Sequence, residues 1–213
     1  MRMTFYTANC RGNAKNSRYP NKRVADNEVD FLEIIAFDHV CGEFKEFRRS
    51  GDNFLSCDVD VMDCDNDHSD NPAEWIHPGE LEERLGRDVA FVAVPSRNNM
   101  KPKDGKSARP RFHVYFPHDP ITEGASCTTL KRAIQKQFPF FDGNALDCAR
   151  FIFGCPSEEI LWHEGEITID CIVKPQERGI PQGQRKSTMS HFAGRVLKRY
   201  GNTGKAHQIF MEE

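Results

Sequence analysis

The chain has 213 residues, of which 38% are hydrophobic, and a formal net charge of -3. A chain of this size and composition can bury one sizeable core with a small additional segment, which excludes disorder throughout. No apolar stretch approaches the roughly 18 residues of a membrane span, and the first twenty residues are polar without a signal-peptide core. We therefore expect a cytoplasmic protein with no membrane partner.

The first half of the chain predicts strands and helices in alternation. In chain order these are a strand at 4–8, a polar basic loop at 9–23, a helix at 30–47 interrupted at Gly42, an acidic strand at 54–64, a turn at 66–72, a short helix at 78–87 and a strand at 89–94. The strand at 54–64 is the most informative, because aspartates follow one another along it.

The second half contains a strand whose two faces differ in chemistry. In the strand at 111–116, Phe112, Val114 and Phe116 share one face, whereas Arg111, His113 and Tyr115 share the other. The remaining predicted elements are a helix at 126–138, strands at 151–153 and 167–173, a linker rich in glycine and proline at 179–183, and a helix at 187–201 capped by Ser187.

Charge is unevenly placed along the chain. Six aspartates fall within residues 58–70, while residues 96–111 contain six Lys or Arg side chains against the single acid Asp104. A second basic stretch, 174–207, has eight Lys or Arg residues opposed by Glu177. This pattern suits a protein that binds a metal at one place and phosphates around it, although solvated surface charge is an alternative for each run.

Two pairs of aspartates could bind a divalent cation. Carboxylates two residues apart on a strand point to the same side, so either Asp58 with Asp60 or Asp63 with Asp65 could converge on Mg²⁺ or Mn²⁺. Ionised pairs in the middle of a strand are costly to desolvate. We therefore favour Asp63 and Asp65, which lie at the strand end.

A calcium-binding loop is an alternative interpretation of the same aspartates. Asp63, Asp65 and Asp67, with Glu74 at the twelfth position, match several acidic positions of an EF-hand. However, the sixth position is His68 instead of glycine, and the preceding element is predicted to be a strand. These departures argue against an EF-hand.

The eight cysteines contain no CxxC pair, so a structural zinc site is not expected and the thiols are expected to be reduced. The spacing leaves open a nonlocal site combining cysteines with a histidine. Its candidate ligands are Cys57, Cys64, Cys148, Cys155, His68 and His163.

Three segments together resemble the motifs of the archaeo-eukaryotic primase (AEP) superfamily, and within it the primase-polymerases of phages and plasmids. They are Met62-Asp63-Cys64-Asp65 at a strand end, Arg109-Pro-Arg111-Phe-His113 on a later strand, and Phe140-Phe141-Asp142 after the predicted helix at 126–138. The resemblance covers about residues 4–173. One departure is Arg111, which stands where the family usually has a serine.

The resemblance implies an α+β fold, with an RRM-like mixed β-sheet as the catalytic core, flanking helices and a short C-terminal helical segment. It implies a primase-polymerase domain at 1–176, then a linker and the start of a helical module at 177–213. It also implies a two-metal site for Mg²⁺ or Mn²⁺ that joins nucleotides on a DNA template. The implied roles are metal binding by Asp63, Asp65 and Asp142, catalysis by these three residues and His113, nucleotide binding by Arg109, Arg111, His113 and Arg150, and template binding by Arg97, Lys101 and Lys103.

The implied partners are single-stranded DNA, nucleoside or deoxynucleoside triphosphates, and a helicase domain in the full-length protein, which a phage or plasmid would encode for use in a bacterial host cell. Two other functions stay open. The basic stretches alone fit a replication initiator module that binds DNA without catalysis. The carboxylates alone fit a two-metal nuclease.

Overall fold

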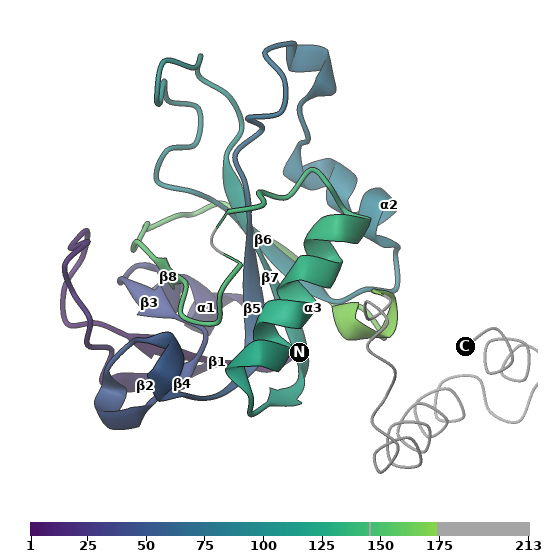
Figure 1. Ribbon diagram of the computed structural model, residues 1–213. Coiled ribbons are helices and arrows are strands. Elements are labelled where there is room, and N and C mark those ends of the chain that lie inside the picture. The colour runs from purple at the N-terminus through teal and green to yellow at the C-terminus, as the bar shows by residue number, and fades with distance from the viewer. Residues whose placement is uncertain (145, 174–213) are drawn as a thin grey trace, which may run out of the picture. The chain divides into compact units, whose positions relative to one another are not determined.

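The computed structural model describes residues 1–144 and 146–173, which belong to one compact unit, Met1–Lys174. The predicted helix at 187–201 and the predicted C-terminal module lie outside the described residues. None of the described helices is long and apolar enough to cross a membrane. The α+β class is confirmed, and the strands form two sheets (Figure 1).

The smaller sheet has four strands in the order β2-β1-β3-β8, and its paired strands are antiparallel. The strands are β1 (Met3–Thr7), β2 (Asn21–Ala25), β3 (His39–Val40) and β8 (Phe151–Ile152). Helix α1 (Glu28–Ile35) follows β2, and the Asn27 side chain caps it by accepting a hydrogen bond from the Asp30 amide.

The larger sheet has five strands in the order β4-β5-β7-β6-β9. They are β4 (Glu43–Phe44), β5 (Phe54–Cys64), β6 (Phe91–Pro95), β7 (Phe112–Ile121) and β9 (Leu161–His163). All paired strands here are antiparallel, so the architecture is two antiparallel sheets instead of the single mixed sheet that we expected.

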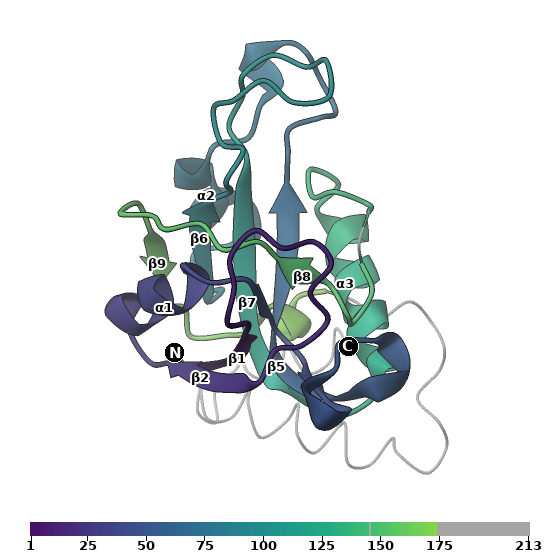
Figure 2. The same ribbon diagram turned by 90° about the vertical axis from the view of Figure 1, so that its left-hand side faces the viewer.

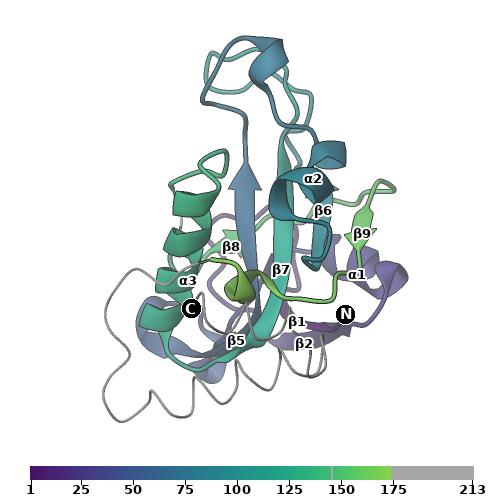
Figure 3. The ribbon, with the colours of Figure 1, turned by 90° about the vertical axis from the view of Figure 1, so that its right-hand side faces the viewer.

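Apolar side chains cover both faces of the larger sheet. On one face, Met62 and Phe116 pack with Leu81 of α2 (Leu81–Leu85) and Ile134 of α3 (Gly124–Gln137). Figures 1 and 3 show α3 and α2 on this side. On the other face, valines of β5 and β6 pack with Phe5 of β1 and with α1, so the smaller sheet forms a layer there (Figure 2).

The remaining helices are single 3₁₀ turns at Lys45–Phe47, Gly51–Asn53, Pro72–Glu74, Pro78–Glu80 and Ile169–Cys171. Two longer segments, the turn after β5 and the loop between β6 and β7, extend side by side beyond the ends of these strands (Figures 1 and 2). Ion pairs join them, including one between Arg109 and Asp70 at 2.8 Å.

Several predicted elements were wrong, and long-range contacts explain most of them. The helix predicted at 30–47 ends at Ile35, after which the chain forms β3 and β4. Here the buried Asp38 carboxylate accepts backbone hydrogen bonds from Gly12, Asn13 and Gly154, which lie far away in sequence. The loop predicted at 9–23 ends in β2, the strand predicted at 167–173 is largely a 3₁₀ turn, and β9 was not predicted.

Candidate active site

Asp63 and His113 lie directly opposite each other on neighbouring strands. They form a register pair of β5 and β7, near the end of β5 and the start of β7. Their side chains share the sheet face of Val61 and Tyr115, because side chains two apart lie on one face. At this end of the strands the face opens, and both side chains are partly accessible.

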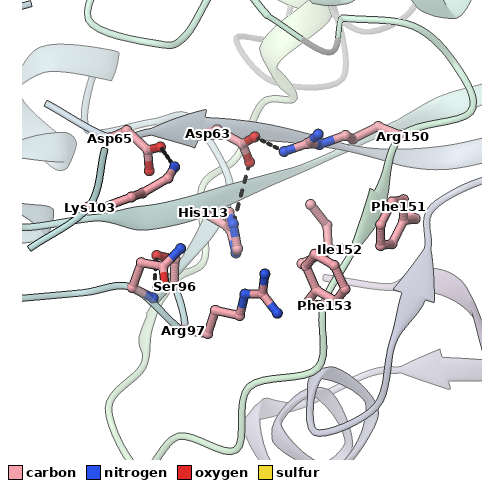
Figure 4. Close-up of a pocket in the computed structure, with 11 residues that line it drawn as sticks. Asp63, Asp65, Ser96, Arg97, Lys103, His113, Arg150, Phe151, Ile152 and Phe153 are labelled. Carbon is pink, nitrogen blue, oxygen red and sulfur yellow. Dashed lines mark hydrogen bonds and ion pairs between the residues drawn. The ribbon is translucent and has the colours of Figure 1, made fainter. Parts of the chain in front are cut away.

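The opening is a cavity of about 180 Å³, which we call the acidic cavity. It is lined by Asp63, Asp65, Ser96, Arg97, Asn98, Lys103, His113, Arg150, Phe151, Ile152 and Phe153. These residues come from the ends of β5 and β7, from the loop after β6, and from the segment that contains β8 (Figure 4). Acidic and basic groups therefore face one another across a space next to an apolar wall.

Each of the two cavity aspartates contacts a basic side chain. Asp63 Oδ2 accepts a hydrogen bond from Arg150 at 2.5 Å, and Asp65 Oδ2 accepts one from Lys103 Nζ at 2.7 Å (Figure 4). The other oxygen of Asp63, Oδ1, is buried and has no hydrogen-bond partner, although His113 Nε2 lies 3.4 Å away. A buried carboxylate oxygen without a partner is costly unless a cation or donor satisfies it.

A third carboxylate lies beside these two. The Asp142 amide donates to the Asp63 carbonyl oxygen at 2.8 Å, which fixes the segment after α3 against the end of β5. Burial, followed by the negative charges of Asp65 and Asp63, raises the pKa of Asp142 to about 6. Asp63 and Asp65 therefore lie close enough to Asp142 to disfavour its ionised form.

The pKa values of two basic groups of the acidic cavity, His113 and Lys103, are also shifted. Burial lowers the pKa of His113, which favours the neutral imidazole at pH 7. The hydrogen bond to Asp65 raises the pKa of Lys103, so this ammonium group stays charged. The cavity is thus lined by two carboxylates, a neutral imidazole and the cationic side chains of Arg97, Lys103 and Arg150, while Asp142 lies beside Asp63 outside the lining residues.

These residues fit a divalent metal ion of the Mg²⁺ or Mn²⁺ type. Such ions prefer carboxylate oxygens, and Asp63 Oδ1 is a buried oxygen without a hydrogen-bond partner. Asp65 and Asp142 lie near it and supply further carboxylates, but within the described residues the three side chains do not bring their oxygens to within 4.8 Å of one another, so they would have to move closer around an ion. Arg150 and Lys103 now neutralise the first two aspartates, so a cation has to compete with these side chains.

The alternative pair, Asp58 and Asp60, does not converge. Asp58 accepts hydrogen bonds from the Thr4 amide and hydroxyl, whereas Asp60 lies against Cys127 of α3 and His118. A register shift between Cys57 and Val59 interrupts the alternation of side chains, so Asp58 and Asp60 point to opposite faces of the sheet. The EF-hand interpretation also fails, because a strand, not a helix, enters the Asp63–Glu74 segment.

The roles predicted for Arg109 and Arg111 need correction. Both side chains are fully buried, and neither lines the acidic cavity. Arg109 donates to backbone oxygens of the turn after β5 and to Asp70, while Arg111 donates to the Lys101 carbonyl and lies 3.6 Å from Asp67. They brace the two extended loops, and a nucleotide cannot reach them in this structure.

Of the three residues predicted to bind template, two line the acidic cavity and one lies outside it. Lys103 points into the acidic cavity, and Arg97 lies at its edge with its guanidinium over the Phe153 ring, 3.6 Å from the centroid (Figure 4). Lys101 is exposed and donates to the Arg97 carbonyl. The apolar wall of Phe151, Ile152 and Phe153 could not be predicted, since a short apolar run indicates only a strand.

No protein-family model matches the sequence, and no curated protein matches it. Among solved structures, the chain is similar to the AEP domain of the primase-polymerase of cyanophage S-2L, with 15% sequence identity and a TM-score of 0.46. The similarity covers 81% of this chain and 89% of that one.

Proposed function

We propose that this chain is a primase-polymerase core of the AEP superfamily that joins nucleotides on a single-stranded DNA template. The observation that carries the proposal is the acidic cavity. Segments far apart in sequence bring Asp63, Asp65 and Asp142 together with His113 and Arg150. Asp63, Asp65, His113 and Asp142 lie in the three motifs whose order resembles that superfamily, and Arg150 follows the third.

In this proposal Asp63, Asp65 and Asp142 hold two Mg²⁺ or Mn²⁺ ions. Bound there, the ions would lower the pKa of the primer 3′-hydroxyl and stabilise the leaving pyrophosphate. The buried Asp63 Oδ1 supports Asp63 as a ligand. The raised pKa of Asp142 supports its inclusion, because a nearby cation would relieve the repulsion among the three carboxylates.

Arg150 and Lys103 would bind the triphosphate. Both now pair with the carboxylates that are proposed to hold metal, and both are about one third exposed, so they can turn toward a phosphate. Guanidinium and ammonium groups form strong charge-assisted hydrogen bonds with phosphate oxygens. The neutral His113 would donate a hydrogen bond to the same group, since its ring faces the cavity (Figure 4).

The cavity volume of about 180 Å³ is below the roughly 300–1,000 Å³ of typical ligand sites, so it would hold only part of a nucleotide. The triphosphate fits the charged side. The apolar wall of Phe151 and Phe153 suits a sugar or base beside it. The template would run along the loop of Arg97 and Lys101, whose cations meet phosphates without reading sequence.

Incorporation of labelled nucleotides on primed and unprimed single-stranded DNA, with Mg²⁺ or Mn²⁺, tests the proposal. The double variant Asp63→Ala/Asp65→Ala should lose at least about a hundredfold in rate, as when a main electrostatic group is removed. Asp58→Ala is the matched control, because Asp58 lies on the same strand but contacts Thr4, away from the acidic cavity. Product on the unprimed strand would establish priming as well as extension.

Two results would contradict the proposal. Degradation of DNA without added nucleotides, lost in the double variant, would identify a nuclease. Tight DNA binding that does not depend on Mn²⁺, with no product under any condition, would favour a non-catalytic initiator module. The helicase domain in the full-length protein, and a role in replicating a phage or mobile element, are further parts of the proposal and rest on the resemblance alone.

A further inference from the structure

A second cluster of metal-ligand side chains lies on the opposite face of β5. Cys57 and Asp60 of β5 meet His118 of β7 with one ligand atom from each within 4.8 Å of the others, the one such group found among residues 1–144 and 146–173. All three residues are buried. A fourth potential ligand, the Cys127 thiol in the first turn of α3, donates to Asp60 Oδ1 at 3.3 Å.

The spacings match those of a tetrahedral zinc site. Zn–S and Zn–N or Zn–O bond lengths give donor atoms about 3.3–3.8 Å apart around a tetrahedron. Here His118 Nε2 lies 3.4 Å from Asp60 Oδ2 and 4.0 Å from Cys57 Sγ. Small side-chain movements would bring these donor atoms to bonding geometry.

The tautomer of His118 also suits metal binding. Nδ1 lies 2.8 Å from the Asp119 carbonyl oxygen, which can only accept, so Nδ1 carries a proton. The neutral ring then has its lone pair on Nε2, the atom that faces Cys57 and Asp60. A backbone carbonyl that orients a histidine in this way is the usual partner behind a metal ligand.

One atom of the cluster lacks a hydrogen-bond partner. Asp60 is 3% exposed, and its Oδ2 has no hydrogen bond within the described structure. Without a metal, burial opposes a charge on His118, but the Asp60 carboxylate outweighs burial and raises the pKa of His118 to about 9. The alternative to a metal is therefore a buried His118–Asp60 ion pair.

We propose that Cys57, Asp60, His118 and Cys127 form a structural site for Zn²⁺ or a similar thiophilic ion. Mixed thiolate, imidazole and carboxylate ligands select zinc over Mg²⁺ or Mn²⁺. The ion would join β5, β7 and the first turn of α3 at the end of β5 remote from the acidic cavity. This inference does not depend on the proposed function. It differs from our expectation that a structural zinc site is absent, and it shares only Cys57 with the nonlocal site that the sequence left open.

Cobalt binding by the full chain tests the site. The protein is stripped with a chelator and titrated with Co²⁺, and absorbance is followed in the near ultraviolet, where thiolate-to-cobalt charge transfer appears. We expect saturation at one equivalent, displacement by Zn²⁺ and a rise in Tm with Zn²⁺. Asp63→Ala/Asp65→Ala should retain the absorbance, because the acidic cavity offers no thiolate.

Ligand variants assign the absorbance to this cluster. Cys57→Ser should at least halve the absorbance, because only the Cys127 thiolate would remain, whereas Cys64→Ser, a buried cysteine of the same strand that packs in the core, should retain it in full. His118→Asn should weaken cobalt affinity roughly tenfold or more. Absence of the absorbance in the unmodified chain, or undiminished absorbance and cobalt affinity in both Cys57→Ser and His118→Asn, would overturn the site in favour of the ion pair. If Cys57→Ser does not fold, His118→Asn and the unmodified chain still decide.

Discussion

At the scale of single residues, the acidic cavity is a balance of opposite charges. Asp63 pairs with Arg150 and Asp65 with Lys103, while Asp142, beside them, adds a carboxylate that forms no ion pair within the part of the chain that the structure describes. Binding a cation at the aspartates would release both basic groups toward phosphate. Metal and nucleotide would then bind with positive coupling, each raising the affinity for the other.

Arg150 provides the sharpest test of this balance. Replacing it in Arg150→Ala should weaken nucleotide binding roughly 10- to 100-fold, the loss expected for a charged hydrogen bond. The measurement is KM for the incoming nucleotide. Arg132→Ala is the matched control, because Arg132 is exposed on α3. Equal effects of the two substitutions would show that Arg150 acts only through general charge.

When no metal is present, the ionised Asp142 carboxylate should lower the free energy of unfolding. Its pKa in the folded chain, about 6, lies above its ordinary value of 3.8 because of burial and of Asp65 and Asp63, so the folded state binds a proton more tightly than the unfolded state. This contribution favours folding below about pH 4 and is lost as pH rises through 6. Asp142→Asn should therefore raise stability at pH 8 by about 1–2 kcal/mol after allowance for partial exposure, and by about half as much at pH 5, which lies between the two pKa values.

Thermal unfolding at both pH values, with a chelator present, measures the effect of Asp142→Asn. Asp52→Asn, an exposed carboxylate, is the control and should change stability at neither pH. The same Asp142→Asn protein should be inactive despite its higher Tm. A lower Tm at pH 8 would contradict the proposed repulsion.

At the scale of elements, the turn after β5 sets the direction of the acidic segment. Asn66 is fully buried with φ of 53°, a left-handed conformation that asparagine tolerates better than most residues. Its side chain accepts from the Ile76 amide at 2.7 Å and donates to the carbonyls of Ile76 and Pro110, each at 2.9 Å. One side chain therefore ties β5 to both extended loops.

Removing that side chain should destabilise the protein strongly. Asn66→Gly keeps the left-handed backbone but leaves buried backbone groups unpaired, so we expect a loss of about 2–4 kcal/mol. Asn66→Ala should cost about 1 kcal/mol more, because alanine disfavours a positive φ. Urea denaturation measures both, with the exposed Asn144→Ala as control. An Asn66→Gly protein as stable as the unmodified chain would contradict this role.

Elements with a strong local pattern could be predicted from the sequence. The bounds of β5 were predicted correctly, and the two faces of β7 were also correct, since Phe112, Val114 and Phe116 pack toward the helices while Tyr115 packs on the other side. The segment after α1 could not be predicted, because the buried Asp38 carboxylate fixes it through contacts that are distant in sequence.

For the site, sequence motifs identified side chains but not their contacts. Asp63, His113 and Arg150 were candidates from motif order, yet their approach depends on strand register and on where β8 returns. Two further features could not be predicted: the burial of Arg109 and Arg111, and the contact of Cys57 with His118. No local sequence pattern distinguishes a buried arginine or a clustered cysteine from an exposed or isolated one.

At the scale of the whole molecule, basic side chains border the acidic cavity on one side. In the loop from β6 to β7, Arg97 lines the cavity at its edge, and Lys101 is exposed outside the cavity. An extended anionic strand would cross this loop before reaching the carboxylates. Affinity for single-stranded DNA should therefore depend on salt.

Lys101→Ala tests this path without changing the cavity, because Lys101 is exposed and does not line it. Each lost phosphate contact on a single strand should lower the slope of log affinity against log salt concentration by about 0.7. The loss should be the same for different template sequences. Lys136→Ala, exposed near the end of α3, is the control and should leave the slope unchanged.

The pairing of β5 with β7 has a consequence for how errors in folding would affect the site. Asp63 stands opposite His113, while the neighbouring Met62 and Cys64 are opposite Val114 and Phe112 in the buried layer. A slip of one residue would turn the charged side chains into that layer and expose the apolar ones. A chain that has buried its core has therefore also placed Asp63 opposite His113. Chains with a shifted register should be unstable instead of folded but inactive.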